Sequence, residues 1–234
     1  LRLLGRLFTF ENPVLNFPAT ELPEKMESLK VEIRDVNRFE KTLSPYPPFT
    51  TDILLREASS KLGYSSSFTM SLAQDLFEMG LCTYHRTDST TVSITGINIA
   101  KTYIKERFPM RFKARRFLEE GAHECIRPTR PIDAERLSNL YSLGLIKFPK
   151  RLTEDHIKLY DLIFRRFVAS QMRDVTVLYQ KFKVRFGENV KEVEEPIKVV
   201  KDGFNLLEPI MIANPINEGV YPVDCLLYTS PSPR

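Results

Sequence analysis

LCTYHRTDST, residues 81–90, brings a tyrosine, a histidine, an arginine and an aspartate within five positions. The stretch follows a helical pattern over residues 67–79 that ends at Gly80, a residue suited to the left-handed cap of a helix. Leu81 to Tyr84 then predicts a short strand or extended segment. A segment that leaves a helix and ends in polar residues holds Tyr84 at a rigid but open position.

The residues around Tyr84 favour chemistry on a phosphate group. A free phenol ionises near pH ~10, so a nucleophilic tyrosine needs a base or a nearby positive charge. His85 and Arg86 are the adjacent candidates. Because a planar guanidinium fits a phosphate better than a carbonyl, we infer a phosphodiester as the target. The alternative is that Tyr84 is a half-buried strand tyrosine and that Asp88 or Ser89 caps the next helix.

Apolar residues at helical spacing predict a helical body between residues 46 and 173. The expected helices cover residues 52–62, 67–79, 93–107, 133–143 and 153–171. The second of them is expected to bury Phe68 and Phe77, and the last to expose Arg166 and His156 to water. The short helices around the Tyr84 segment predict a winged-helix-like arrangement, which often serves nucleic acids.

Alternating apolar and charged residues predict strands on both sides of the helical body. Leu29, Val31 and Ile33 follow this period of two, and the same period returns from Asp174 to about Val200. The predicted fold is therefore α+β and multidomain, with a β-rich domain interrupted by a helical, winged-helix-like domain that carries the tyrosine.

Three prolines at positions 45, 47 and 48 mark the first domain boundary. The predicted domains are residues 1–45 and 174–224 for the two crossings of the β-rich domain, and 46–173 for the helical domain. The last ten residues, 225–234, resemble a translated vector or adapter sequence, and we exclude them from functional interpretation.

A basic loop over residues 107–116 interleaves cations with phenylalanines, a pattern that suits a phosphate backbone and stacked bases. The DNA-binding candidates are Arg111, Lys113, Arg115 and Arg116, together with Arg130 from the following segment. The alternative is a solvated loop that happens to be basic. GAHECIRPTRPID, residues 121–133, is also too polar for a linker with only a structural task, and it contains His123, Glu124 and Arg127.

The composition is that of a globular protein, with 234 residues, 42% hydrophobic and 27% charged, which allows one large or two modest domains. A net charge of +4 permits an anionic partner without requiring one. No apolar run approaches the length of a membrane span. The three scattered cysteines do not form a disulfide framework and favour a reducing, cytoplasmic location.

Two motifs, TYHRTDS at residues 83–89 and AHECIRPT at residues 122–129, resemble those of type IA DNA topoisomerases. PPFTTDILLREASSKLG upstream and LYDLIFRRFVASQM downstream extend the resemblance, which covers residues 1 to 223. The histidine after the tyrosine and GAHECIRPTRPID as a whole resemble the reverse gyrase branch of that family.

The resemblance implies a role for each polar residue of these motifs. Tyr84 is expected to cut one DNA strand and to hold its 5′ phosphate as a phosphotyrosine. Arg86 would clamp the scissile phosphate. His123 would hydrogen-bond that phosphate or the backbone nearby, with Asp88 able to orient it. The supporting candidates are His85, Glu124 and Arg127.

The family also implies parts that this sequence does not contain. Topoisomerases of this type bind Mg²⁺ in a Toprim domain, and reverse gyrases use ATP in a helicase-like half to drive positive supercoiling. The sequence has no P-loop and no acidic DxD cluster, so we assign no metal ligands and expect both domains elsewhere in the same polypeptide. The resemblance makes the β-rich domain a gate for a second strand, with hinges near residues 45–48 and near Arg173.

The expected partner is DNA, mainly single-stranded, which this fragment would bind weakly and would not cleave alone. Three alternatives stay open. Cys82, His85, His123 and Cys125 could form a zinc site. The helices and the basic loop could make a non-catalytic module that binds single-stranded DNA, in which Tyr84 stacks on bases. The full protein could also be a topoisomerase I or III that only relaxes DNA.

Overall fold

The computed structural model describes residues 2–3, 6–7, 30–117 and 123–222. The chain divides into two compact units. The sheet unit comprises Leu1–Lys41, Val177–Val199 and Met211–Arg234, and the helical unit comprises Thr42–Thr176 and Val200–Ile210. The tail predicted at 225–234, and most of the chain before Lys30, lie outside the described residues.

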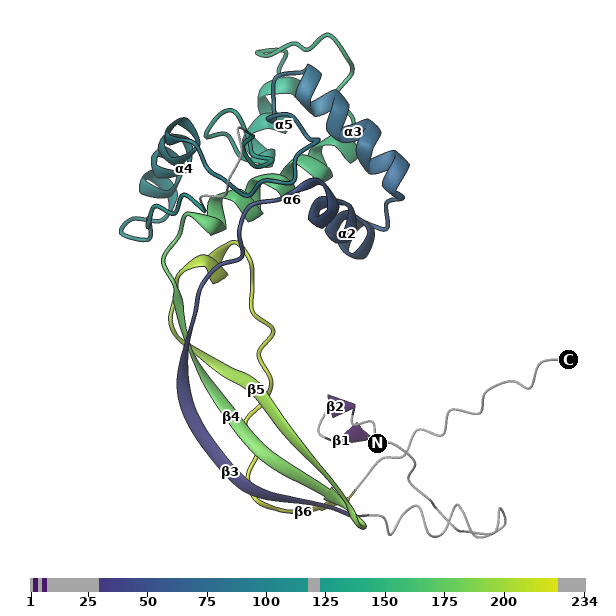
Figure 1. Ribbon diagram of the computed structural model, residues 1–234, viewed down its shortest axis with the longest axis vertical. Coiled ribbons are helices and arrows are strands. Elements are labelled where there is room, and N and C mark those ends of the chain that lie inside the picture. Colours follow the sequence, from purple (N-terminus) through teal and green to yellow (C-terminus); the bar gives the residue numbers. More distant parts are fainter. Residues whose placement is uncertain (1, 4–5, 8–29, 118–122, 223–234) are drawn as a thin grey trace, which may run out of the picture. The chain divides into compact units, whose positions relative to one another are not determined.

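The sheet unit contains four strands in the order β5-β4-β3-β6 (Figure 1). They are β3 (Lys30–Leu43), β4 (Val175–Phe186), β5 (Asn189–Lys201) and β6 (Gly219–Pro222). β3 and β6 pair antiparallel, with Ile33 opposite Gly219. β4 and β5 form a hairpin through Gly187, whose φ of 59° lies in the left-handed region that favours glycine. Two further short strands, β1 (Arg2–Leu3) and β2 (Arg6–Leu7), pair antiparallel with each other.

An apolar cluster stabilises the sheet unit. It consists of Val31, Ile33, Phe182, Val184, Phe186 and Ile216. The predicted burial of Val31 and Ile33 is confirmed, because both side chains are 1% exposed or less. Gln180 is also buried; its amide donates to Asn214 O at 3.0 Å, and its carbonyl accepts from Ile216 N at 3.0 Å. The mixed α+β fold class predicted from the sequence is therefore correct.

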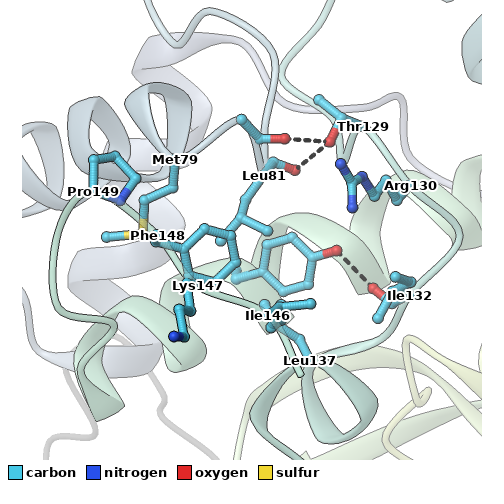
Figure 2. Close-up of a pocket in the computed structure, with 12 residues that line it drawn as sticks. Met79, Leu81, Thr129, Arg130, Ile132, Leu137, Ile146, Lys147, Phe148 and Pro149 are labelled. Atoms are coloured by element: carbon cyan, nitrogen blue, oxygen red, sulfur yellow. Dashed lines mark hydrogen bonds between the residues drawn. The ribbon is translucent and has the colours of Figure 1, made fainter. Parts of the chain in front are cut away.

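Helix α6 (Glu154–Ser170) is the central element of the helical unit (Figure 1). The helices α2 (Thr51–Leu62), α3 (Ser66–Glu78), α4 (Ile94–Arg107) and α5 (Ala134–Ser142) all pack against it, as does the short 3-10 helix η1 (Phe204–Leu206). Leu159, Ile163 and Phe167 are fully buried on α6. The buried Tyr160 hydroxyl donates to Ile132 O at 2.6 Å, beside a cavity drawn in Figure 2.

All five predicted helices are present, with each end within one residue of its expected position. The cap residues explain this agreement. Ser93 and Asp133 accept hydrogen bonds from the backbone N–H of Gly96 and Arg136, and Thr153 forms a capping box with His156. Gly63 and Gly80 end α2 and α3 with φ near 70°, as their sequence positions predicted.

Four side chains on these helices differ from the prediction. His156 is buried because its ring completes the Thr153 capping box and lies 3.3 Å from Asp75 Oδ2. Arg166 is also buried; its Nε is 2.5 Å from Glu208 Oε1, and its guanidinium lies over the rings of Tyr46 and Phe49. The predicted burial of Phe68 and Phe77 is wrong, because they are 41% and 39% exposed.

Among the described residues, no helix has both the length and the apolar character needed to span a bilayer.

Candidate active site

The segment after α3 is extended and alternates between exposed and buried side chains. Tyr84, Arg86 and Asp88 are exposed, whereas His85, Thr87 and Ser89 are buried. The predicted short strand is reduced to one isolated bridge between Cys82 and Pro128. The period of two nevertheless persists, so that the Tyr84 phenol and the Arg86 guanidinium lie on the same exposed side.

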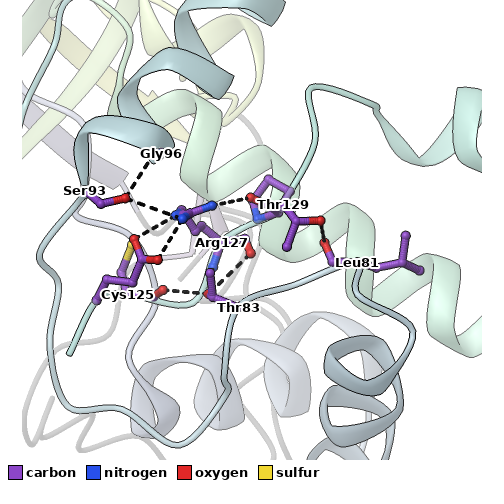
Figure 3. A network of polar contacts seen from close by, with 9 residues as sticks. Leu81, Thr83, Ser93, Gly96, Cys125, Arg127 and Thr129 are labelled. Carbon is purple, nitrogen blue, oxygen red and sulfur yellow. Dashed lines mark hydrogen bonds and ion pairs between the residues drawn. The ribbon is translucent and has the colours of Figure 1, made fainter.

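Hydrogen bonds on both flanks hold this segment. On one side Thr83 N donates to Arg127 O at 2.9 Å and Thr129 N donates to Leu81 O at 3.0 Å. The Thr83 hydroxyl donates to Cys125 O at 2.8 Å and accepts from Arg127 N at 2.9 Å (Figure 3). The two sequence motifs that were noted separately are thus joined through their backbones.

The N-terminus of α2 holds the other side. Thr51 N donates to Thr87 O at 2.8 Å, and the Thr51 hydroxyl donates to His85 O at 2.7 Å. Thr83 joins the segment to residues 125–127 just before Tyr84, and Thr51 bonds it just after Tyr84, so the backbone that carries the phenol is held on both sides.

Tyr84 lies on an open pocket, which we call the Tyr84 pocket. Its lining residues are Phe77, Gly80, Cys82, Thr83, Tyr84, Arg86, Thr87, His123, Glu124 and Thr129. The pocket therefore brings together Tyr84, Arg86 and His123, which come from the two motifs. The Tyr84 ring is 46% exposed and meets the edge of the Phe77 ring at a centroid distance of 5.2 Å. Phe77 is therefore part of the pocket lining rather than of the core.

Arg86 and His123 are exposed, and neither makes a hydrogen bond or an ion pair with another described residue. Their polar atoms are therefore available to a ligand in the Tyr84 pocket. Asp88 is exposed as well but does not line the pocket. The prediction that Asp88 orients His123 stays a prediction.

Glu124 and Arg127 form a fixed pair beside the pocket (Figure 3). Arg127 is 5% exposed, and its Nη2 and Nε lie 2.7 and 2.9 Å from the two carboxylate oxygens of Glu124. Burial raises the pKa of Glu124, but hydrogen bonds from Arg127 and Ser93 outweigh it and leave that pKa below its usual value. Arg127 thus acts on the pocket by holding Glu124 ionised.

His85 faces inward and does not line the pocket. Its ring is 2% exposed, and Nδ1 is buried without a hydrogen-bond partner among the described residues. Burial and the neighbouring charge of Arg86 lower the pKa of His85. The imidazole is therefore neutral at pH 7, and its ring supports Tyr84 from below at a centroid distance of 5.3 Å.

The basic loop is largely committed to ion pairs within the helical unit. Lys113 and Arg115 both pair with Asp174, and Arg111 pairs with Asp202 at 2.7 Å. Arg115 also donates to the backbone carbonyl oxygens of Ser170 and Met172. The Arg116 side chain is exposed and, within the described part of the chain, makes no hydrogen bond or ion pair, although its backbone carbonyl accepts from Val92 N at 2.7 Å. Arg130 is likewise exposed and without such a partner there.

The structure gives no support to the zinc alternative. Among the described residues, no three or more His, Cys, Asp or Glu side chains are grouped so that they could hold a metal ion. Cys82 and Cys125 are buried thiols, and burial raises the pKa of Cys125 to about 12. The described residues likewise contain no group of carboxylates that could hold the Mg²⁺ implied by the family resemblance.

Sequence reasoning missed several residues of the Tyr84 pocket. Phe77 was assigned to a buried stripe, and Thr83 and Thr129 were not singled out. Because both threonines act through hydrogen bonds to a partner some 40 positions away in the sequence, no local pattern marks them.

The chain is similar in sequence to known proteins of one family. Residues 16–218 match the family described as DNA topoisomerase. Reverse gyrase of Pyrococcus furiosus is 51% identical over 182 residues, which cover 77% of this chain and 15% of the relative. Reverse gyrase of Pyrobaculum aerophilum is 47% identical over 204 residues, 86% of this chain and 17% of the relative.

A solved structure of full-length topoisomerase I from Thermotoga maritima has a similar fold. It superposes with a TM-score of 0.65 at 31% sequence identity, covering 87% of this chain and 34% of that chain. The chain thus spans about a sixth of the length of the curated relatives described above.

Proposed function

The chain belongs to the DNA topoisomerase family, and we propose that its helical unit supplies the nucleophile with which a type IA enzyme cuts and reseals one DNA strand. The observation that carries this proposal is the convergence of Tyr84, Arg86 and His123 on one open pocket. Tyr84 presents a solvent-accessible phenol, and the two cationic or hydrogen-bonding groups beside it have no competing partner among the described residues.

The proposed cleavage is a transesterification. The phenolic oxygen of Tyr84 bonds to phosphorus, and the bond from phosphorus to the 3′ oxygen breaks. The 3′ oxygen leaves with the bonding electrons and gains a proton, while the phenol releases its proton to solvent. The product is a 5′-phosphotyrosine and a free 3′ hydroxyl. Resealing reverses these steps without new activation, because the ester preserves the phosphodiester energy.

Two neighbours of Tyr84 have separate tasks in this proposal. Arg86 binds the non-bridging oxygens of the scissile phosphate and stabilises the charge that develops on them. His123 hydrogen-bonds the same phosphate or the adjacent backbone. Glu124 is held as an anion by Arg127, so it repels misplaced phosphates and limits where the strand enters. His85 and Arg127 position the segment and do not touch the phosphate.

The relatives favour the reverse gyrase reading of the whole protein, in which ATP drives positive supercoiling. Mg²⁺ would be bound by a Toprim domain and ATP by a helicase-like half, neither of which the described residues provide. The sheet unit would serve as the gate domain and the helical unit, with its winged-helix-like part, would swing to open it. The substrate is DNA in a mainly single-stranded state, and the location is cytoplasmic.

A labelled oligonucleotide tests the proposal in the longer protein that contains this chain. With Mg²⁺ and a denaturant to stop the reaction, single-stranded DNA labelled at its 3′ end is expected to leave its label on the protein. DNA labelled at its 5′ end is expected to release a free labelled fragment. Tyr84→Phe abolishes both results, and Tyr46→Phe, a control at another exposed tyrosine of the helical unit, preserves them.

The same assay separates the alternatives. A non-catalytic binding module would give no covalent label while still binding single-stranded DNA. A relaxing-only topoisomerase would give the label but would not introduce positive supercoils with ATP. The 234-residue chain alone is expected to bind single-stranded DNA weakly without cleaving it, and cleavage by this chain with Mg²⁺ would contradict that expectation.

A further inference from the structure

A second cavity lies next to the Tyr84 pocket and shares two of its residues. This cavity, which we call the Phe148 pocket, has a volume of about 240 Å³. Gly80 and Thr129 line both pockets. The Thr129 hydroxyl donates to Gly80 O at 2.6 Å, and it lies 3.3 Å from Leu81 O (Figure 2). These bonds tie the ridge between the two pockets together, so a strand crossing the ridge would enter both.

The interior of the Phe148 pocket is apolar and aromatic. Met79, Leu81, Leu137, Ile146 and Phe148 contribute to its walls, and Tyr160 closes it from α6 (Figure 2). Its size is below the range of about 300–1,000 Å³ that is usual for small-molecule sites. The pocket therefore suits a single flat ring system rather than a folded segment.

The mouth of the Phe148 pocket is basic. Arg130 and Lys147 line it, both are exposed, and neither pairs with an acidic residue in the described part of the chain. An apolar slot with two unpaired cations at its rim complements a nucleotide, which has a flat base and an anionic phosphate on either side. A purely apolar occupant would leave both cations without a partner.

The wall formed by residues 143–151 is held in place before a ligand binds. The Phe148 ring stacks on Tyr141 with an interplanar angle of 23° and a centroid distance of 6.0 Å. Lys150 pairs with Asp75 and, at 2.7 Å, with Glu78 of α3. Because its aromatic face is fixed by these contacts, the pocket loses little conformational entropy on binding.

We propose that the Phe148 pocket receives one unpaired nucleobase of the single strand whose phosphate lies at Tyr84, with Arg130 and Lys147 on the flanking phosphates. The proposal rests on the proposed function, because it takes single-stranded DNA as the substrate. Apart from the two cations, the Thr129 and Tyr160 hydroxyls of the lining are already engaged, with Gly80 O and Ile132 O respectively. The base is therefore held by stacking and shape, with little discrimination between sequences.

Binding of the 234-residue chain to two short oligonucleotides of equal length tests this inference. One is oligothymidylate, and the other has the same sugar-phosphate backbone without bases. We expect the wild-type chain to prefer the base-bearing strand. Phe148→Leu, which keeps an apolar side chain but removes the aromatic face, is expected to lower affinity for that strand roughly 5- to 100-fold. Affinity for the abasic strand stays unchanged.

The rim cations are expected to behave differently. Lys147→Ala and Arg130→Ala lower affinity for both strands alike, and each reduces the salt dependence of binding by about 0.7 in the log–log slope. Leu143→Ala, at an exposed residue of the same loop, and Lys198→Ala on β5 serve as matched controls and change neither quantity. The thermal transition of each variant establishes that it is folded.

The outcomes separate this inference from the proposed function. If wild-type and Phe148→Leu chains bind the two strands equally well, the Phe148 pocket does not hold a base, and the role of Tyr84 is unaffected. The same result is expected if another segment of the polypeptide fills the pocket. If the chain binds neither strand at any salt concentration, both proposals fail.

Discussion

Around Tyr84, exposed side chains that can meet a ligand alternate with buried side chains that hold the segment in place. The side chains at 84 and 86 are exposed and line the pocket, whereas those at 85, 87 and 89 are buried, with Thr87 also part of the pocket lining. A shift by one residue would bury the phenol and expose the imidazole, because side chains alternate along an extended chain. The bond from Thr51 to His85 O and the bonds that join Thr83 to Cys125 O and Arg127 N fix this register.

His85 makes the stability of the helical unit sensitive to mild acid. The unfolded chain takes up a proton on this residue near pH ~6.5, but in the folded protein burial and Arg86 lower the pKa. The stability contributed by the neutral ring is therefore present above pH ~6.5 and is lost as the pH falls toward the folded pKa. We expect the melting temperature of His85→Gln to fall less between pH 7 and pH 5 than that of the wild type, as measured by circular dichroism.

The two proteins differ only at residue 85, so the difference between the two curves belongs to His85. If the melting temperatures of the two proteins fall in parallel with pH, burial of the His85 imidazole does not make stability depend on pH. Because the residue supports the Tyr84 ring, the same substitution is also expected to reduce the yield of covalent adduct in the longer protein.

The Asp174 carboxylate binds two cations of the basic loop. It accepts a hydrogen bond from the Ser44 hydroxyl, forms an ion pair with Lys113, and pairs with Arg115 Nη2 at 2.7 Å. Burial raises the pKa of Asp174, but the opposite effect of these partners is larger and brings the pKa down to about 2. Asp174→Asn is expected to destabilise the helical unit by about 1–3 kcal/mol in denaturant unfolding at pH 7, because Arg115 loses its counter-charge.

The sign of the pH dependence follows from the lowered pKa. The contribution of Asp174 is present above the ordinary value near 3.8 and disappears as the pH falls through about 2. Asp35→Asn is the matched control, since Asp35 forms an exposed pair with Lys183 that water and salt screen, so its loss is expected to change stability little. Equal losses in the two variants would mean that Asp174 is no more than a surface charge.

At the scale of helices and strands, local signals were sufficient to predict positions but not neighbours. Caps such as Ser93, Asp133 and Thr153 mark helix starts through bonds to the next few residues, so the sequence alone located them. Arg166 was misjudged because its partners, Glu57 and Glu208, are more than 40 positions away in the chain. The polar motifs predicted the candidate residues of the site, whereas the Phe77 contact and the Thr83 bonds arise from tertiary packing.

Helix α4 depends on a glycine for its approach to the site. A Cβ at Gly96 would lie 2.9 Å from Cδ and Nε of Arg127, whose guanidinium is held by Glu124. Alanine normally stabilises a helix by about 1 kcal/mol relative to glycine, but here the clash is expected to dominate. Gly96→Ala should destabilise the helical unit by about 1–3 kcal/mol in denaturant unfolding.

Asn98→Ala is the control for Gly96→Ala, because it changes an exposed position of the same helix and is expected to be neutral or slightly stabilising. The displaced Arg127 would also release Glu124, so Gly96→Ala is expected to weaken binding of single-stranded DNA more than its stability loss explains. A stabilised Gly96→Ala variant would show that Arg127 moves aside at little cost.

At the scale of the whole molecule, the chain runs through the sheet unit, the helical unit and the sheet unit again. The change of period from two to 3.6 and back was the basis for expecting a helical domain between two β-rich segments. The segment Val200–Ile210 was assigned to the sheet, yet it lies in the helical unit, where Leu207 O accepts from Arg165. Its sequence has no periodic pattern that would reveal this association.

Each unit has its own buried core, so the two are expected to unfold separately. Phe182 belongs to the cluster of the sheet unit and Phe164 to α6 of the helical unit, and both are 1% exposed or less. Either substitution by alanine removes about 3–5 kcal/mol from the unit that contains it. Phe182→Ala should therefore accelerate amide exchange in β3, β4 and β5 while α6 stays protected, and Phe164→Ala should do the reverse. Equal loss of protection in both units would mean that they unfold as one, and a gate that opens by moving one unit against the other would then lack independent parts.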